Sequence, residues 1–486
     1  MAAPPWSNWA QTVQWTGAVQ KPTTLEELER CVKGASRVFV VGSGHSFHFP
    51  AAPPTEGLTS GTILLDLTHG FNKVLSVQPS TEGDRSGTCV VEAGCSLGQL
   101  ATTLQKQNLA LESMPSLMSI TIAGAVLTGT HGSGASISVM ATLVNEMDVM
   151  TASGEVVTIR DPRFFLHVGL LGIVIRLTLR CVPSYSLHQR VYEHIQLQKF
   201  LPMAREVVEH VESSSFWIDL GRAEVMAWLR FRIEDMTPTE ELDVGGMLRA
   251  IPVRVSETND PVQTQMTGPW LDVLPFFGIG QSLPNRETVQ AEFFIPLSEV
   301  QQAIEALQAI PDAARHLPHI EVRVVKGDHL ALSPCNFRFL TDEKDLFACL
   351  HFGFPKNMQT VAMTVNAIER ALKPWGSRPH WGKLFTVSGC TLERFCGPAA
   401  HRDCAAFWAL VLHHDPRGKF RNALIDQVAR KVVAVQEFKQ LHGALPGRWP
   451  FHCRSIDSTA LATGTLVLAS MAAMVLVFRR KMLASR

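Results

Sequence analysis

The stretch VFVVGSGHSF, residues 38–47, joins an apolar run to a glycine turn and a histidine. The run is typical of a buried β-strand, and Gly42 and Gly44 allow a sharp turn where it ends. Successive backbone N–H groups in such a turn form a concave site that suits an anion. On these residues alone, His45 is either an ordinary turn residue or part of a phosphate-binding site.

A second glycine-rich stretch, TIAGAVLTGTHGSG, occupies residues 121–134. Two such turns, with their hydroxyl side chains, could hold the two phosphates of a pyrophosphate. GSGHSF does not match the GxGxxG pattern of nicotinamide-binding folds, because Phe47 stands at the third glycine position. Neither turn carries the lysine of a P-loop. The sequence therefore argues against a nicotinamide-dependent dehydrogenase.

The pattern of strands and helices indicates more than one folding unit. In the first 180 or so residues, short strand-like runs alternate with helical ones, and Thr24 and Glu27 have capping-box spacing at the start of a helix. EMDVMTASGEVVTI predicts a β-hairpin that turns at Ser153 and Gly154. From Pro183 onward, the order of strands and helices predicts an α+β domain with a mixed sheet.

Composition excludes several classes of protein. The chain has 486 residues, and its 44 Lys and Arg balance 44 Asp and Glu, so nothing favours a nucleic-acid partner. The ten cysteines are scattered and show no zinc or redox-dithiol spacing. We therefore expect reduced thiols and no metal site.

The two ends of the chain differ. The start, MAAPPWSNWAQTVQW, lacks the features of a signal peptide. Residues 459–478 carry no charge and are followed by Arg479, Arg480 and Lys481, which predicts a transmembrane helix at the C-terminus. A buried C-terminal helix is the alternative. The basic tail favours the opposite orientation, but the missing signal peptide leads us to expect a membrane-anchored protein whose catalytic body is cytosolic.

Six stretches, in this order, resemble the vanillyl-alcohol-oxidase type (PCMH type) of FAD-linked oxidases, in the branch of alditol (xylitol) oxidases and aldonolactone (gulonolactone) oxidases. They are GSGHSF, SMPSLMSITIAGAVLTGTHGSG, GLLGIVIRLTL, IEVRVVKGDHLALSPC, RPHWGKLF and DPRGKFRN. The resemblance implies an α+β fold in which a two-subdomain FAD-binding domain is joined to a substrate (cap) domain. The predicted segments are an FAD-binding domain at 1–182, a substrate domain at 183–380, a return to their interface at 381–430, a linker at 431–458 and a transmembrane helix at 459–478.

The resemblance also assigns the cofactor side of the site. It implies FAD linked covalently through its 8α-methyl group to His45, although His48 and His131 are further candidates by residue type. A covalent link needs an imidazole held in a fixed place, which a rigid glycine turn can provide. We read His131 as a residue that lines the pocket and orders the second turn. The predicted cofactor-binding residues are Gly42, Ser43, Gly44, His45, Ser46, Ser116, Thr121, Gly124, Thr128, Gly129, Thr130 and His131.

The substrate side depends on a strand and two loops. Glu321 and Arg323 alternate along a predicted strand and so point to one face, where they could bind the hydroxyls of a polyol or simply form a cross-strand salt bridge. In the family, the residues matching Lys383 and Ser116 lie near the reacting hydroxyl. The predicted catalytic residues are Lys383, Glu321, Arg323 and Ser116, and the predicted substrate-binding residues are these four and His351.

These residues predict an FAD-dependent oxidase that takes a hydride from a polyol CH–OH group and passes the electrons to oxygen, giving hydrogen peroxide. Pro115 stands where related dehydrogenases commonly have an alanine that obstructs oxygen. Gly353 replaces a threonine of alditol oxidases, and EVRVVKGDHLALSPC is more similar to gulonolactone oxidases. An aldonolactone oxidase is therefore the alternative substrate class. A membrane-tethered scaffold is a further alternative, but a non-catalytic relative has no need of the complete set of site residues.

Overall fold

In the computed structural model, the described residues all belong to one compact unit, Met1–Glu437. The described residues are 6–17, 19–47, 61–80, 86–233, 249–250, 266–275, 287–317, 319–386, 402–422 and 425. The predicted linker and transmembrane helix, residues 431–458 and 459–478, lie outside these ranges, as does His48. Within the described ranges, no helix combines the length and apolar character needed to cross a bilayer.

A small parallel sheet supports the first glycine turn. Its strand order is β3 (Val19–Gln20), β5 (Thr62–Asp66) and β4 (Arg37–Val41). The predicted capped helix is confirmed as α1 (Leu25–Gly34), because the Thr24 hydroxyl accepts a hydrogen bond from the backbone N–H of Glu27. The Glu27 carboxylate accepts from the N–H of Thr23, one residue before the cap.

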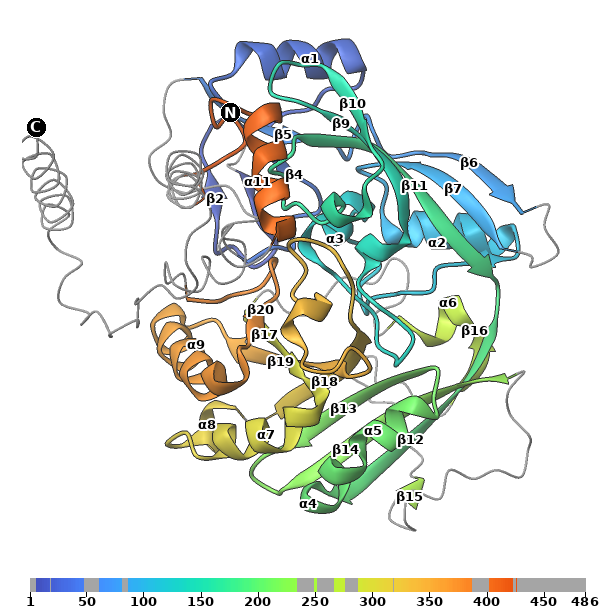
Figure 1. The fold of residues 1–486 in the computed structure, drawn as a ribbon, viewed down its shortest axis with the longest axis vertical. Coiled ribbons are helices and arrows are strands. Elements are labelled where there is room, and N and C mark those ends of the chain that lie inside the picture. The colour runs from blue at the N-terminus through green and yellow to red at the C-terminus, as the bar shows by residue number, and fades with distance from the viewer. Residues whose placement is uncertain are drawn as a thin grey trace, which may run out of the picture. The chain divides into compact units, whose positions relative to one another are not determined.

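The second sheet is antiparallel, and helices α2 (Leu97–Lys106) and α3 (Ile122–Thr128) accompany it (Figure 1). Its strand order is β10 (Val156–Ile159), β9 (Val144–Met150), β11 (Ile173–Pro183), β7 (Gly87–Glu92) and β6 (Val74–Pro79), with β8 (Leu109–Ala110) paired to β11. The predicted hairpin is confirmed as β9 and β10, and Gly154 takes a φ of +87° in its turn. Leu97, Leu100 and Leu104 form the buried face of α2.

The third and largest sheet follows Pro183. Its strand order is β15 (Arg249–Ala250), β12 (Ser186–Gln196), β14 (Glu224–Arg232), β13 (Ser213–Asp219), β18 (His319–Lys326), β19 (Leu346–Pro355), β17 (Thr288–Pro296) and β20 (Arg378–Pro379), with β16 (Met266–Pro269) paired to β12. Every strand pair in it is antiparallel, so the predicted mixed sheet is wrong.

The connections explain this difference. Helices α7 (Val300–Gln308) and α8 (Ala313–His316) link β17 to β18, and strands joined through a helix commonly run in the same direction. These two strands do so, but β19 lies between them and opposes both. In the same way, α4 (Leu197–Phe200) and α5 (Ala204–Glu209) link β12 to β13, and β14 lies between these strands. Each helical connection therefore skips one strand.

The two faces of this sheet have different chemistry. In β18, Ile320, Val322 and Val324 are buried in the hydrophobic core, to which α4, α5, α7 and α9 (Met358–Leu372) also contribute apolar side chains. Figure 1 shows these helices beside the large sheet. The alternate residues, Glu321 and Arg323, line a cavity on the other side. A strand that presents successive side chains to opposite faces produces this division.

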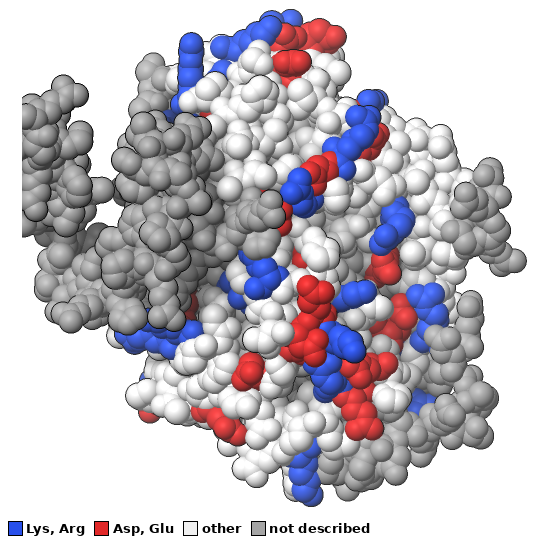
Figure 2. All heavy atoms as spheres, in the orientation of Figure 1, with Lys and Arg blue, Asp and Glu red and all other residues white. Residues whose placement is uncertain are grey.

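The chain returns to the first sheet after α11 (Arg402–His414). The N–H of Val38 in β4 donates to the carbonyl of Lys419 at 2.9 Å, and the Arg37 guanidinium donates to the carbonyl of Arg421 at 2.7 Å. The segment DPRGKFRN thus lies beside the strand that leads into the first glycine turn. On the face shown in Figure 2, acidic and basic side chains are interspersed.

Further small elements of the described fold are the antiparallel pair β1 (Trp6–Ser7) and β2 (Gln14–Trp15), and helix α6 (Trp270–Val273).

Candidate active site

The first glycine turn follows β4 and fits closely against the second. A Cβ added to Gly42 would overlap the hydroxyl of Thr121. Gly44 has a φ of +74°, a conformation that residues other than glycine rarely adopt. The N–H of Phe47 donates to the carbonyl of Gly382 at 2.9 Å. The turn that carries His45 is therefore fastened to the loop that carries Lys383.

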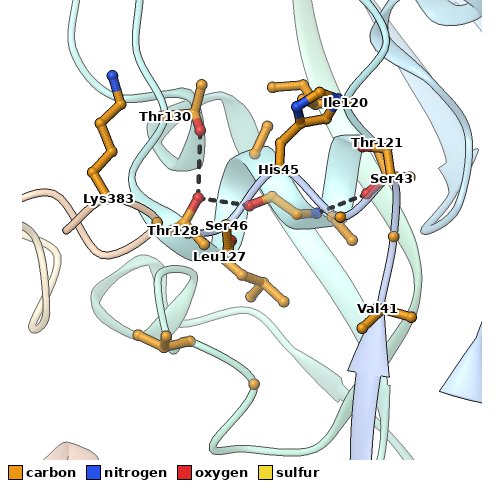
Figure 3. Close-up of a pocket in the computed structure, with 18 of the residues that line it drawn as sticks. Val41, Ser43, His45, Ser46, Ile120, Thr121, Leu127, Thr128, Thr130 and Lys383 are labelled. Carbon is orange, nitrogen blue, oxygen red and sulfur yellow. Dashed lines mark hydrogen bonds between the residues drawn. The ribbon is translucent and has the colours of Figure 1, made fainter. Parts of the chain in front are cut away.

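The second turn is built around α3. The Thr121 hydroxyl accepts from the N–H of Gly124 at 3.3 Å, and the Thr128 hydroxyl donates to the Gly124 carbonyl at 2.8 Å (Figure 3). Gly129 ends the helix with a φ of +75°, and the Thr128 and Thr130 hydroxyls lie 3.4 Å apart. Threonine hydroxyls and glycine backbone thus gather beside the first turn.

Both turns line one cavity of about 480 Å³. The same cavity is lined by side chains of the large sheet and by Lys383, which points into the space shown in Figure 3. All the predicted site residues except Gly129 line it, although their sequence positions span more than 300 residues. The close approach of Gly42 to Thr121 leaves backbone, rather than side chains, along part of the cavity wall. These residues suit a bulky ligand with a phosphate-bearing part.

His45 lies at the end of the first turn with its ring stacked on Trp9, at 5.7 Å between centroids. The Ser119 hydroxyl is 3.4 Å from its Nε2 atom. Burial lowers the pKa of His45 to about 4, so its imidazole is neutral at physiological pH and retains a nucleophilic nitrogen lone pair. The ring is thus both held in place and available for a covalent bond.

The predicted strand pair is an ion pair on the cavity side of β18. Arg323 Nε donates to Glu321 Oε1 at 2.7 Å, and the Arg323 guanidinium also donates to the Ser116 hydroxyl. His351 Nδ1 on β19 lies 3.5 Å from Glu321 Oε2. Burial opposes the charge on Glu321, yet Arg323 and His351 hold its pKa below the usual value. Four of the five predicted substrate-side residues, all except Lys383, therefore form one connected network.

Lys383 has a partner that the sequence reasoning missed. Its Nζ lies 2.8 Å from Glu292 Oε2 on β17, while Glu292 Oε1 lies 3.0 Å from His131 Nε2. His131 Nδ1 also contacts the Gly132 carbonyl at 2.7 Å, so Glu292 joins the second glycine turn to Lys383. Burial alone would raise the pKa of Glu292, but Lys383 and His131 hold it well below the usual value.

A sequence signal for Glu292 exists. The run AEFFIPL is strand-like and otherwise free of charge, so a carboxylate within it needs a partner once the strand is buried. The run does not reveal which cation that partner is.

His131, Glu292 and Cys349 bring their possible ligand atoms within 4.8 Å of one another. Both oxygens of Glu292 already have partners, and burial raises the pKa of the Cys349 thiol well above its usual value. This chemistry favours an ion-pair network over a metal site.

Comparisons with known proteins agree with this geometry. Residues 16–160 match the model of an FAD binding domain, and residues 285–428 match that of D-arabinono-1,4-lactone oxidase. The chain is 31% identical to an alditol oxidase from Streptomyces sp. over 86% of its own length and 97% of that protein. It is 26% identical to the L-gulonolactone oxidase of Bos taurus over 87% of its own length and 97% of that protein.

Solved structures show the same fold. A solvent-stable cholesterol oxidase superposes with a TM-score of 0.69 at 16% identity, covering 87% of this chain and 97% of that one. The cholesterol oxidase of B. sterolicum gives a TM-score of 0.68 at 14% identity, covering 87% and 96%. The chain therefore belongs to the PCMH-type family of FAD-dependent oxidoreductases that includes alditol oxidase and the gulonolactone and arabinonolactone oxidases.

Proposed function

We propose that this protein oxidises a CH–OH group of a polyol, as an alditol oxidase does, with oxygen as electron acceptor and hydrogen peroxide as product. The observation that supports this function most strongly is that the His45 turn, Lys383 and the Glu321–Arg323 ion pair line one cavity. The two glycine turns and His45 would hold FAD, which would supply the redox chemistry as acceptor of the two electrons removed from the carbinol carbon.

The chain's own residues bind and orient the substrate. Lys383, held by Glu292, donates a hydrogen bond to the reacting hydroxyl and stabilises the negative charge on its oxygen as the proton passes to solvent water. Ser116 supports that hydroxyl, and Glu321 and Arg323 bind the neighbouring hydroxyls. Fixing several hydroxyls at once keeps the reacting carbon in place, which removes much of the entropic cost of the reaction.

Stopped-flow bleaching of the flavin tests this function. Xylitol and sorbitol should reduce the flavin with saturable rates, followed by peroxide release in air. Lys383→Met should retain FAD and lose about 100-fold or more in the reduction rate, while Lys344→Met, at an exposed lysine, should match the wild type. Failure of every polyol and lactone to bleach the flavin would refute the function.

Oxidation of an aldonolactone is the second candidate. Gly353 favours it, because an added Cβ there would meet no atom within 4 Å and no threonine hydroxyl is available for a polyol. Faster bleaching by gulono-1,4-lactone than by xylitol or sorbitol would assign the protein to this class.

The covalent attachment of FAD to His45 is part of the proposal. The neutral, stacked imidazole and the rigid turn support it. After acid denaturation, flavin absorbance should remain with the polypeptide, and a peptide containing residues 38–47 should carry the added mass. In His45→Ala the flavin should be released. Complete release from the wild type would contradict the link.

Membrane anchoring through residues 459–478 is also proposed, on the uncharged sequence and the basic residues after it. A cytosolic catalytic body is proposed with it, although those basic residues favour the opposite orientation. In cell fractions, the full chain should sediment with membranes and resist carbonate extraction, whereas a chain ending at residue 437 should not. Protease applied outside intact cells or sealed organelles should spare the catalytic body. An unchanged distribution on truncation would rule out the anchor.

A further inference from the structure

A small recess opens behind the substrate network. Ser116, Trp217 and Arg323 line both the main cavity and this recess, so these three residues are a shared wall of the two spaces. The recess has a volume of about 10 Å³, which is room for a single water molecule or one monatomic ion. Its far wall includes Ser213 and Arg230.

Arg230 is the unusual member of this wall. It sits on β14 opposite Ser213 of β13, is only 4% exposed, and lines the recess. Its Nε has no hydrogen-bond partner, and among the described residues no carboxylate forms an ion pair with it. Burial of a guanidinium that has no ion-pair partner is costly: burial and the nearby Arg323 lower the pKa of Arg230 to about 9, while Glu321 acts in the opposite direction.

The nearby carboxylate is already engaged. Glu321 accepts from Arg323 through one oxygen and faces His351 with the other. Arg230 and Arg323 thus both line the recess, while Glu321 forms an ion pair with Arg323. Hydroxyl donors at Ser213 and Ser215 complete a polar lining. This combination of cations and hydroxyls suits one anionic atom.

We propose that the recess is an anion subsite in which Arg230, with Ser213 and Ser215, binds a single anionic atom. The atom comes either from a free halide or from a carboxylate at the far end of a polyhydroxy acid that enters past Arg323. The second source rests on the proposed function and extends its substrate class from neutral polyols to their acids. Anion binding itself stands independently of the reaction.

The test uses the FAD-loaded protein and follows perturbation of its flavin absorbance. Sodium chloride and sodium gluconate are titrated separately at constant ionic strength maintained with sodium sulfate. The affinity for each ion, obtained from the saturable absorbance change, should fall about tenfold or more in Arg230→Met, because a charge-assisted hydrogen bond is lost. Arg230→Lys, which keeps the charge, should bind with intermediate affinity. Ser215→Ala should weaken binding, whereas Ser214→Ala, on the opposite face of β13, should not.

The source of the anion follows from two further measurements. If gluconate reduces the flavin faster than sorbitol does, and Arg230→Met removes this difference in rate, the anion is the acid group of the substrate. If chloride binds but gluconate does not reduce the flavin faster than sorbitol, the anion is a free halide. Both results support the subsite.

Two outcomes overturn the subsite: neither ion perturbs the flavin, or a folded Arg230→Met binds both ions as tightly as the wild type. Exchange of a buried, unpaired cation for an apolar side chain should leave the melting temperature unchanged or higher, which checks folding. A wild type that binds anions but oxidises no polyol or lactone would refute the proposed function alone.

Discussion

The two sides of the cavity are built by different means. The cofactor side consists of two turns in which glycine and threonine are close in sequence and the backbone itself forms the surface. The proposed substrate side consists of single side chains, such as Glu292, Glu321 and His351, that come from separate strands and meet across β17, β18 and β19. The first depends on local conformation, and the second depends on strand register. Substitutions should therefore separate FAD retention from substrate oxidation.

The largest effect is expected where the two turns touch. Gly42→Val places a branched side chain against Thr121, at a cost of about 1–3 kcal/mol. The fraction of protein carrying FAD, measured from the ratio of flavin to protein absorbance, should fall about tenfold or more. Gly34→Ala is the control, because an added Cβ there meets nothing within 4 Å. Full flavin content in Gly42→Val would show that the turns do not hold the cofactor.

On the substrate side, Glu321→Gln should have the opposite signature. It retains the shape of the side chain but removes the charge that holds Arg323, so the flavin-reduction rate should fall about 100-fold. FAD content should equal that of the wild type. Glu343→Gln, at an exposed position, is the matched control. A parallel loss of flavin would mean that the two sides are not separable.

Glu292→Gln tests the residue that joins the sides. The buried carboxylate pairs with Lys383 and His131, and its neutralisation leaves both without an anionic partner. We expect the free energy of unfolding to fall by about 3 kcal/mol, measured by urea denaturation. Both FAD retention and substrate reduction should suffer, unlike in Glu321→Gln. Wild-type stability would show that Glu292 is dispensable as a link.

Low pH should lower the stability of the fold on which both sides of the cavity depend. Burial lowers the pKa of His167 and His380 to about 3 and that of His351 to about 4, whereas an unfolded histidine titrates near 6.5. Below pH 6.5 the unfolded chain binds protons that the folded chain does not. The contribution of these histidines to the free energy of unfolding is therefore fully present above that pH and declines as the pH falls toward 4. The melting temperature should therefore be lower at pH 5 than at pH 7.5.

A matched pair of variants checks the origin of this acid sensitivity. In His167→Gln, the melting temperature should fall less between pH 7.5 and pH 5 than it does in the wild type. His210→Gln, at an exposed site, should leave it unchanged. A melting temperature that does not vary over this range would contradict the buried neutral histidines.

The smallest effect concerns substrate choice. Gly353 is exposed and has space for a side chain, so Gly353→Thr should restore a hydroxyl that favours polyols. The ratio of kcat/KM for xylitol to that for gulono-1,4-lactone should rise about three- to tenfold, which corresponds to one added hydrogen bond. Gly353→Val, similar in volume but without the hydroxyl, should not raise the ratio.

The sequence by itself determined the features that depend on neighbours in the chain. The cap at Thr24, the hairpin turn at Gly154 and the glycine turns around His45 and His131 all follow from residues within a few positions of one another. The alternation of Glu321 and Arg323 also placed both on one face. Such patterns reflect backbone preferences and side-chain periodicity, which act locally.

Only the tertiary structure decided the pairing of distant segments. Strand order converted an expected mixed sheet into an antiparallel one, because β19 and β14 entered between helix-linked strands. The same order brought Glu292 to Lys383 and His131, and it left Arg230 beside Arg323 without a carboxylate of its own. A buried charge signals in the sequence that it needs a partner, but the fold selects that partner, since the contact spans strands far apart in the chain.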